Sequence, residues 1–391
     1  MPRILVLGTA DTKAQELAYL ATLLRAGSLP VVTADVGTCA AAMPCDITAE
    51  TIAAHDPDGA AAVLGLSDRG RAVAAMATAL AHFLPRQSDL AGVIGIGGGG
   101  GTAIITAGMR ELPYGLPKIM VSTLASGQTA PYIGISDLIL MPSVTDLAGL
   151  NTLSRTILHN AARALLGMTA SPAPRQTGLP AIGLTMFGVT TPCVTAITAA
   201  LPDRDCLTFH ATGTGGRTME KLAESGLLTA FIDITTTEVA DLLCGGTLAC
   251  TEDRFGAAAR TRLPWIGSLG ALDMVNFGAP ETVPPHLKAR LFYHHNPQVT
   301  LMRTTPAENT RIGHWIATKL NQCHGPVKLL IPERGISALD IAGGPFHDPE
   351  ANAALFTALE TTLTHKITRL PLHINDPAFA AACVRAYREI Q

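Results

Sequence analysis

The chain has 391 residues, more than one hydrophobic core usually fills, so two domains are expected. Hydrophobic residues make up 48% and charged residues 15%, which argues against intrinsic disorder and for a globular protein. The formal net charge of −3 and the aromatic content of 4% disfavour nucleic acid as a partner.

The eight cysteines form no pattern typical of a metal site or a disulfide framework. No pair has the C-x-x-C spacing, and the close pairs Cys39/Cys45 and Cys244/Cys250 have no histidines beside them. We therefore expect buried free thiols and no metal site. The first apolar run is too short for a signal peptide, and no apolar run approaches the ~18 residues of a membrane span. These features favour a cytoplasmic protein that does not act on membranes.

The first part of the chain alternates between strand and helix patterns. Continuous apolar runs predict strands at 4–8, 30–36, 90–97, 118–123 and 137–142. Apolar residues three and four apart predict helices between them, for example at 12–26 and 69–84. Strands that are apolar throughout are buried on both faces, which indicates a parallel sheet covered by helices.

Residues 171–180 carry three prolines and no periodicity, so they are the predicted boundary between domains 1–170 and 181–391. Beyond it the pattern restarts. Strands are predicted at 181–187, 206–211, 228–234, 265–269, 327–332 and 368–373, and helices at 216–225, 306–321, 350–364 and 377–389. Residues 271–298 have little regular pattern and are expected to form a long functional loop. The predicted fold class is α/β, with two Rossmann-like domains whose mainly parallel sheets are flanked by helices.

Gly8-Thr9-Ala10-Asp11-Thr12-Lys13 directly follows the first predicted strand. In doubly wound sheets, ligands bind beyond the carboxyl ends of the strands. Thr9 and Thr12 offer hydroxyl groups, and Lys13 places a cation in the first turn of a helix, where the helix dipole favours an anion. The alternative is that Asp11 or Thr12 only caps the helix and Lys13 is solvated.

A run of glycines follows the strand at 90–97. It comprises Gly97, Gly98, Gly99, Gly100 and Gly101, with Thr102 expected to begin a helix. Such a run lets backbone N–H groups approach an anion and permits positive φ, at a cost in conformational entropy. It matches neither the P-loop nor the complete dinucleotide-binding fingerprint. We expect contact with a phosphate or nucleotide, against the alternative of a flexible turn.

Three further segments are candidates for the same site, because they follow other strands of the predicted sheet or begin a helix. Ser126, Gly127 and Gln128 come after the strand at 118–123, and Asp146 comes after the strand at 137–142. Arg69 stands at the start of a helix, where a guanidinium without an anion is unfavourable. Helix capping or solvation explains each one alone equally well, whereas their common position favours one site.

The second half contains a similar strand–glycine–helix segment, whose predicted anion-binding residues are His210, Thr212, Gly213, Gly215, Gly216 and Arg217. Four further residues are candidates for acid–base catalysis: Asp233, Glu238, Asp273 and His295. Because no spacing fixes their mutual geometry, structural capping networks remain the alternative.

Several of these segments together carry a family resemblance. They are residues 8–13, 90–101, 125–129, 185–193, 209–213, 233–241, 270–278 and 373–376. In these segments the chain resembles the ATP-binding family that includes the N-terminal inhibitory region of the tomato mosaic virus resistance protein. The resemblance extends from about residue 3 to residue 390. It implies two α/β domains and ATP bound in the first, with contacts from Lys13, Arg69, Gly98 to Gly101, Ser126 to Gln128, and Asp146.

Two functions are consistent with these observations. The first is a cytoplasmic enzyme that uses ATP, with Mg²⁺, on a small anionic metabolite at a site between the domains. The second is a non-catalytic ATP-binding regulatory or interaction module, because the plant relative inhibits a viral helicase. In either case we expect a homodimer or higher homo-oligomer.

Overall fold

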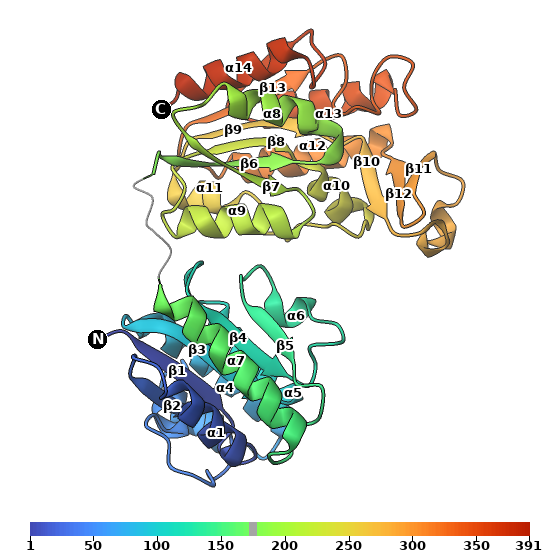
Figure 1. Ribbon diagram of the computed structural model, residues 1–391. Helices are drawn as coiled ribbons and strands as arrows, with labels where there is room; N and C mark the ends of the chain where they lie inside the picture. The colour runs from blue at the N-terminus through green and yellow to red at the C-terminus, as the bar shows by residue number, and fades with distance from the viewer. Residues whose placement is uncertain (172–177) are drawn as a thin grey trace. The chain divides into compact units, whose positions relative to one another are not determined.

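The computed structural model describes residues 1–171 and 178–391 (Figure 1). The chain divides into two compact units, Met1–Pro174 and Arg175–Gln391. Residues 172–177 of the predicted boundary segment lie outside the described residues. None of the helices in the described ranges combines the length and apolar character that crossing a bilayer requires.

The first unit contains a five-stranded parallel sheet with the strand order β2-β1-β3-β4-β5. Its strands are β1 (Arg3–Gly8), β2 (Val31–Asp35), β3 (Leu90–Gly97), β4 (Lys118–Ser122) and β5 (Ile139–Pro142). Strand β1 lies between β2 and β3, so the chain leaves β1 for one side of the sheet and later returns on the other. In a doubly wound sheet such a reversal opens a crevice at the carboxyl ends of the two strands.

Helices cover both faces of this sheet, as the apolar strands predict. Ile4 and Val6 of β1 pack with α1 (Ala14–Leu24) and α7 (Thr152–Ala170). Leu5 and Leu7 point the other way, because successive side chains of a strand alternate between faces. They pack with α2 (Ala49–Ala53), α3 (Ala60–Leu64), α4 (Arg69–Phe83) and α5 (Gly99–Met109). A short helix, α6 (Ala130–Ile133), follows β4.

The second unit has a six-stranded parallel sheet with the order β14-β13-β9-β8-β6-β7. Its strands are β6 (Ala181–Met186), β7 (Asp205–His210), β8 (Phe231–Thr235), β9 (Trp265–Gly270), β13 (Val327–Pro332) and β14 (Lys366–Leu370). Core residues of α8 (Thr191–Ala199) and α14 (Pro377–Arg388) pack on one face. The other face carries α9 (Thr214–Glu224), α10 (Thr237–Cys244), α11 (Gly256–Thr261), α12 (Pro306–Leu320) and α13 (Pro349–Thr362).

The predicted α/β class and mainly parallel sheets are confirmed, and each predicted strand is found within a few residues of its expected bounds. The expected loop at 271–298 is correct only in part. Strands β10 (Met274–Phe277) and β11 (Phe292–Asn296) lie within it and form a small antiparallel sheet with β12 (Val299–Arg303), whereas residues 278–291 contain no strand. Strand β11 is largely exposed and polar, which explains why hydrophobic patterning missed it.

The eight cysteines are free thiols, as expected. Their expected burial is correct for four of them, Cys193, Cys250, Cys323 and Cys383. It is wrong for Cys39, which is exposed, and for Cys45, Cys206 and Cys244, which are half-buried.

Candidate functional site

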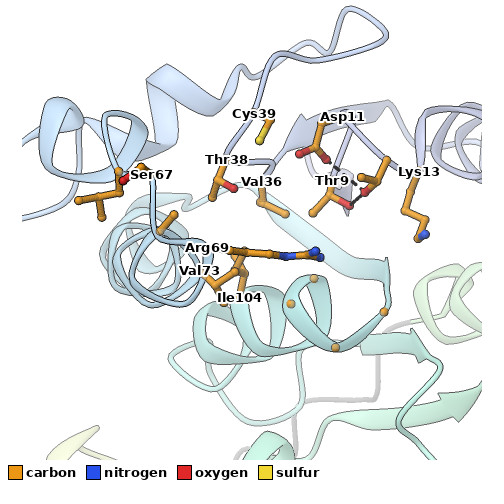
Figure 2. A pocket seen from close by; sticks show the side chains of 17 residues that line it. Thr9, Asp11, Lys13, Val36, Thr38, Cys39, Ser67, Arg69, Val73 and Ile104 are labelled. Atoms are coloured by element: carbon orange, nitrogen blue, oxygen red, sulfur yellow. Dashed lines mark hydrogen bonds between the residues drawn. The ribbon is translucent and has the colours of Figure 1, made fainter.

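A cavity of about 320 Å³ lies at the carboxyl ends of β1 and β3, where the strand order reverses. It is lined by the segment after β1 (Thr9, Asp11, Thr12 and Lys13), the start of α5 (Gly98–Gly101) and the start of α4 (Ser67 and Arg69). Figure 2 shows these segments converging from separate elements on one hollow. The sequence therefore identified three walls of one cavity, from segments as distant in the chain as Thr9 and Gly101.

The glycine run forms the first turn of a helix rather than a loop. Helix α5 begins at Gly99, three residues earlier than expected, with Gly98 as its N-cap. The N–H groups of Gly99, Gly100 and Gly101 donate to no described residue, as is usual for the first turn of a helix. These amides lie at a wall of the cavity and carry the positive end of the helix dipole.

The packing around this turn does not require glycine. None of the residues Gly97 to Gly101 has a positive φ, contrary to the conformational freedom that the run was expected to provide. A Cβ added at Gly98, Gly99, Gly100 or Gly101 would have no neighbour nearer than 3.4 Å. Gly97 differs, because its Cβ would come within 2.9 Å of the backbone of Gly101 and Thr102. Gly97 is therefore structural, whereas the other four keep the cavity wall bare.

Two cations face this wall. Arg69 extends from α4 toward the side of the cavity where Thr9 and Lys13 lie (Figure 2). Neither the Lys13 ammonium nor the Arg69 guanidinium has a hydrogen bond or ion pair with a described residue. Both lie near the start of a helix, where a cation is unfavourable by about 0.3–1 kcal/mol unless an anion compensates it.

Oxygen ligands lie next to these cations. The hydroxyls of Thr9 and Thr12 are 2.8 Å apart, and the Thr12 hydroxyl donates to the Asp11 carboxylate over 3.2 Å. The buried Asp35, at the end of β2, joins the segment that carries them to the segment that follows β2. Its Oδ1 accepts hydrogen bonds from the N–H groups of Ala10 (2.8 Å) and Gly37 (2.7 Å).

Several residues predicted for this site lie outside the cavity. Ser126, Gly127 and Gln128 are exposed after β4, and Asp146 is exposed after β5, where its Oδ1 caps the N–H of Leu147. Thr102 is fully buried, and its hydroxyl lies 2.6 Å from that of Ser122. The cavity instead includes Thr38, Cys39 and Val73, which sequence reasoning missed. Thr38 and Cys39 follow β2, so the rule of strand carboxyl ends could have found them.

The glycines of the second predicted anion loop have a structural explanation. A Cβ at Gly213 would overlap the carbonyl oxygen of Ala249, and one at Gly215 would overlap that of His210. A Cβ at Gly216 would overlap the carboxylate of Glu238. The N–H of Gly213 donates to Glu238 Oε2 over 2.7 Å, so this amide already has an anionic partner. Around this loop, Arg217 and His210 are exposed and Thr212 is half-buried.

Asp233 and Glu238 meet at a buried guanidinium. Arg254 donates to Glu238 (2.6 Å), to both oxygens of Asp233 (2.8 Å each) and to Glu220 (3.0 Å). Asp233 also accepts from Thr185, and all these carboxylates are buried. Burial raises the pKa of Glu220 to about 7. This network ties β8, α9 and α10 together, which is the structural alternative to an acid–base role.

The other two acid–base candidates lie elsewhere. Asp273 follows β9, is fully buried and accepts from Ser337 over 2.7 Å. Burial and the neighbouring Asp340 raise its pKa. His295 is exposed on the edge strand β11. The four candidates are therefore distributed over three places and do not form one constellation.

Comparisons with known proteins relate both units to one family. Residues 2–174 match the N-terminal domain, and residues 179–391 the C-terminal domain, of "Uncharacterised protein family (UPF0261)". A UPF0261 protein of Rhizobium meliloti (strain 1021) is 65% identical over 100% of this chain and 99% of its own length. The ToMV resistance protein Tm-1(GCR237) of Solanum lycopersicum is 42% identical over 100% of this chain and 56% of its own length. The resemblance inferred from the sequence motifs is confirmed.

Proposed function

The chain belongs to the UPF0261 family, and from the geometry of its first unit we propose that it binds ATP, with the phosphates at the start of α5. Lys13 and Arg69 hold the phosphates from the opposite side of the cavity. ATP supplies the energy for a reaction on a small anionic metabolite, and this cavity holds the phosphates of the ATP.

The observation that carries this proposal is the bare helix start at Gly98 to Gly101. Four consecutive glycines weaken a helix, because each costs roughly 0.5–1 kcal/mol relative to alanine in regular structure. Neither the backbone angles nor the neighbouring atoms require them. A bound group that needs close contact with several N–H donors does require them, and phosphate at a helix N-terminus is such a group.

The charges of the cavity fit a triphosphate. Two cations that pair with no described residue and a helix N-terminus face the same space, and all three attract anions. The carboxylate of Asp11 and the hydroxyls of Thr9 and Thr12 are the hard oxygen ligands that Mg²⁺ prefers. Mg²⁺ is typically held by one or two carboxylates together with phosphates and water, so this set suits Mg²⁺ on ATP and neutralisation of phosphate charge.

One observation favours the second candidate, an ATP-binding module without turnover. Asp11 is the only carboxylate among the described residues that line the cavity, and no histidine lines it. If Asp11 holds Mg²⁺, the described lining supplies no further carboxylate and no histidine as general base. A reaction that needs such a base then requires a group from elsewhere.

Calorimetry on the full chain tests the proposal. We expect ATP to bind more tightly with Mg²⁺ than without it, and Asp11→Asn to abolish that difference while retaining Mg²⁺-free binding. Absence of ATP binding to the folded protein contradicts the proposal. Incubation with Mg·ATP and a library of phosphorylated and carboxylated metabolites separates the two candidates, because turnover with any compound shows an enzyme and intact ATP favours the module.

A further inference from the structure

A second cavity of about 420 Å³ adjoins the first in the same unit. Thr38 and Cys39 line both cavities, so the two meet at the segment that follows β2. Its other walls include Asp35 at the end of β2, Met43 and Pro44 from the following loop, and Thr48 and Glu50 at the start of α2. The two cavities share this wall, and others of their lining residues follow β1, β2 and β3 at the carboxyl ends of these strands.

The wall of the second cavity is held in place at two points. The N–H of Ala42 donates to the carbonyl oxygen of Ala10 over 2.9 Å. Asp46 Oδ2 accepts from both the N–H and the hydroxyl of Thr33, each over 2.8 Å. Residues 36–46 are thus anchored on β2 and on the segment after β1, so the cavity is part of the fold.

The two cavities differ in chemistry. The first has a helix N-terminus and two cations that have no partner in the described part of the chain, which suit phosphates. The second has no lysine, arginine or histidine among its described lining residues. Two carboxylates, Asp35 and Glu50, lie beside apolar surface from Met43, Pro44 and Leu64. The carboxylates can accept hydrogen bonds from the hydroxyl groups of a sugar, and the apolar surface can contact a base. The same carboxylates repel phosphate.

Asp35 supplies the most specific contact. Only 3% of its surface is exposed, and both of its hydrogen bonds to described residues, from Ala10 and Gly37, use Oδ1. Its other oxygen, Oδ2, has no hydrogen bond to a described residue. Burial raises the pKa of Asp35, so a further donor to the carboxylate would stabilise its ionised form.

We propose that the second cavity binds the nucleoside half of the nucleotide, with ribose hydroxyls donating to Asp35 and the base against Met43, Pro44 and Leu64. This inference rests on the proposed function, because it assumes phosphates in the first cavity. It implies preference for a ribonucleotide over a deoxyribonucleotide. Loss of a hydrogen bond to a charged group typically costs about 1.5–3 kcal/mol, so we expect at least tenfold weaker binding of 2′-deoxy-ATP.

The test uses calorimetry on the full chain with three probes: ATP, 2′-deoxy-ATP and inorganic tripolyphosphate. Asp35→Asn keeps an oxygen for the Ala10 and Gly37 amides but removes the second carboxylate oxygen. We expect this substitution to weaken ATP binding at least tenfold and to leave tripolyphosphate binding unchanged. The variant should bind ATP and 2′-deoxy-ATP with equal affinity. Thermal unfolding of the variant verifies that the loop anchors survive.

A second variant tests occupancy without changing charge. Ala41 is exposed and lines the second cavity, so Ala41→Leu reduces the space for a nucleoside. Ala61→Leu, on an exposed position of α3 outside both cavities, is the matched control. We expect Ala41→Leu to weaken ATP but not tripolyphosphate, and Ala61→Leu to change neither.

The outcomes separate the two proposals. If ATP binds equally well to the wild type and to both cavity variants, and 2′-deoxy-ATP binds the wild type as tightly as ATP does, the nucleoside lies elsewhere and only this inference is overturned. If neither ATP nor tripolyphosphate binds the folded wild-type protein, the proposed function fails and the inference fails with it.

Discussion

Alanine at Gly99 and Gly100 should change stability and ligand binding in opposite directions. In the structure, the added Cβ atoms would lie 3.8 Å from Leu124 Cδ1 and 3.4 Å from Val73 Cγ2, so both fit without displacing a neighbour. Alanine is the better helix former by roughly 0.5–1 kcal/mol per residue, and the first turn gives the lower end of that range. We therefore expect the double variant to be more stable by about 1 kcal/mol, which raises the melting temperature by about 2–4 °C.

Binding should weaken in the same variant. The two methyl groups occupy space above the free amides of the first turn, where the proposal places phosphate oxygens. Loss of one charged hydrogen bond costs about 1.5–3 kcal/mol, equivalent to a roughly tenfold to hundredfold rise in the Kd for ATP. Calorimetry measures this rise, and thermal unfolding measures the stability.

A matched control separates helix propensity from the site. Gly167 lies inside α7 on an exposed surface, and a Cβ added there would have no heavy atom within 4 Å. Gly167→Ala should stabilise the protein to a similar degree per residue and leave ATP affinity unchanged. If the double variant at Gly99 and Gly100 keeps wild-type affinity, the phosphate position is wrong. If it melts at a lower temperature, the steric argument for a bare helix start is wrong.

Three further predictions concern charged groups. Lys13→Met and Arg69→Met should each weaken ATP binding about tenfold in calorimetry. Arg71→Met, on the same helix as Arg69 but outside the cavity, should leave ATP binding unchanged. Equal effects of all three substitutions would indicate only a general charge effect. Arg254→Met leaves three buried carboxylates without their shared cation, so urea unfolding should show a free energy of unfolding lower by about 3–5 kcal/mol. A decrease of less than about 1 kcal/mol would contradict the role of the network. Burial raises the pKa of the Asp241 carboxyl from 3.8 to about 7, so the folded state binds the carboxyl proton more tightly than the unfolded state does. The stability that this protonated carboxyl contributes is full below pH 3.8 and is lost as the pH rises to 7. Between pH 5 and pH 8 the free energy of unfolding should therefore fall more for the wild type than for Asp241→Asn, and an equal fall would refute the shift.

The sequence was sufficient for the parallel sheets because burial on both faces leaves a local pattern. In β1, Ile4 and Val6 pack on one layer of helices while Leu5 and Leu7 pack on the other, so the whole strand is apolar. The small antiparallel sheet left a weaker pattern, because its buried strands β10 and β12 contain Asn276, Thr300 and Arg303 among their apolar residues. Strand β11 is exposed and half polar, so it leaves no burial pattern, although only two residues separate it from its antiparallel partner β12.

The sequence also placed Thr9, Lys13, Arg69 and the glycine run near strand ends or helix starts, which is a local property. It could not tell which ends are neighbours. The order β2-β1-β3-β4-β5 brings the segment after β1 beside the start of α5, and it leaves Ser126 and Asp146 outside the cavity.

The two glycine-rich turns illustrate what only the tertiary structure decided. In sequence, the residues after β3 and those after β7 look alike, since each follows a strand and begins a helix. In the folded protein, Gly216 makes room for the carboxylate of Glu238, whereas Gly99 and Gly100 face a cavity. The sequence determined where the chain is free of side chains, because that is a property of each residue. What fills the space beside a glycine depends on residues distant in the chain, and only long-range packing brings them there.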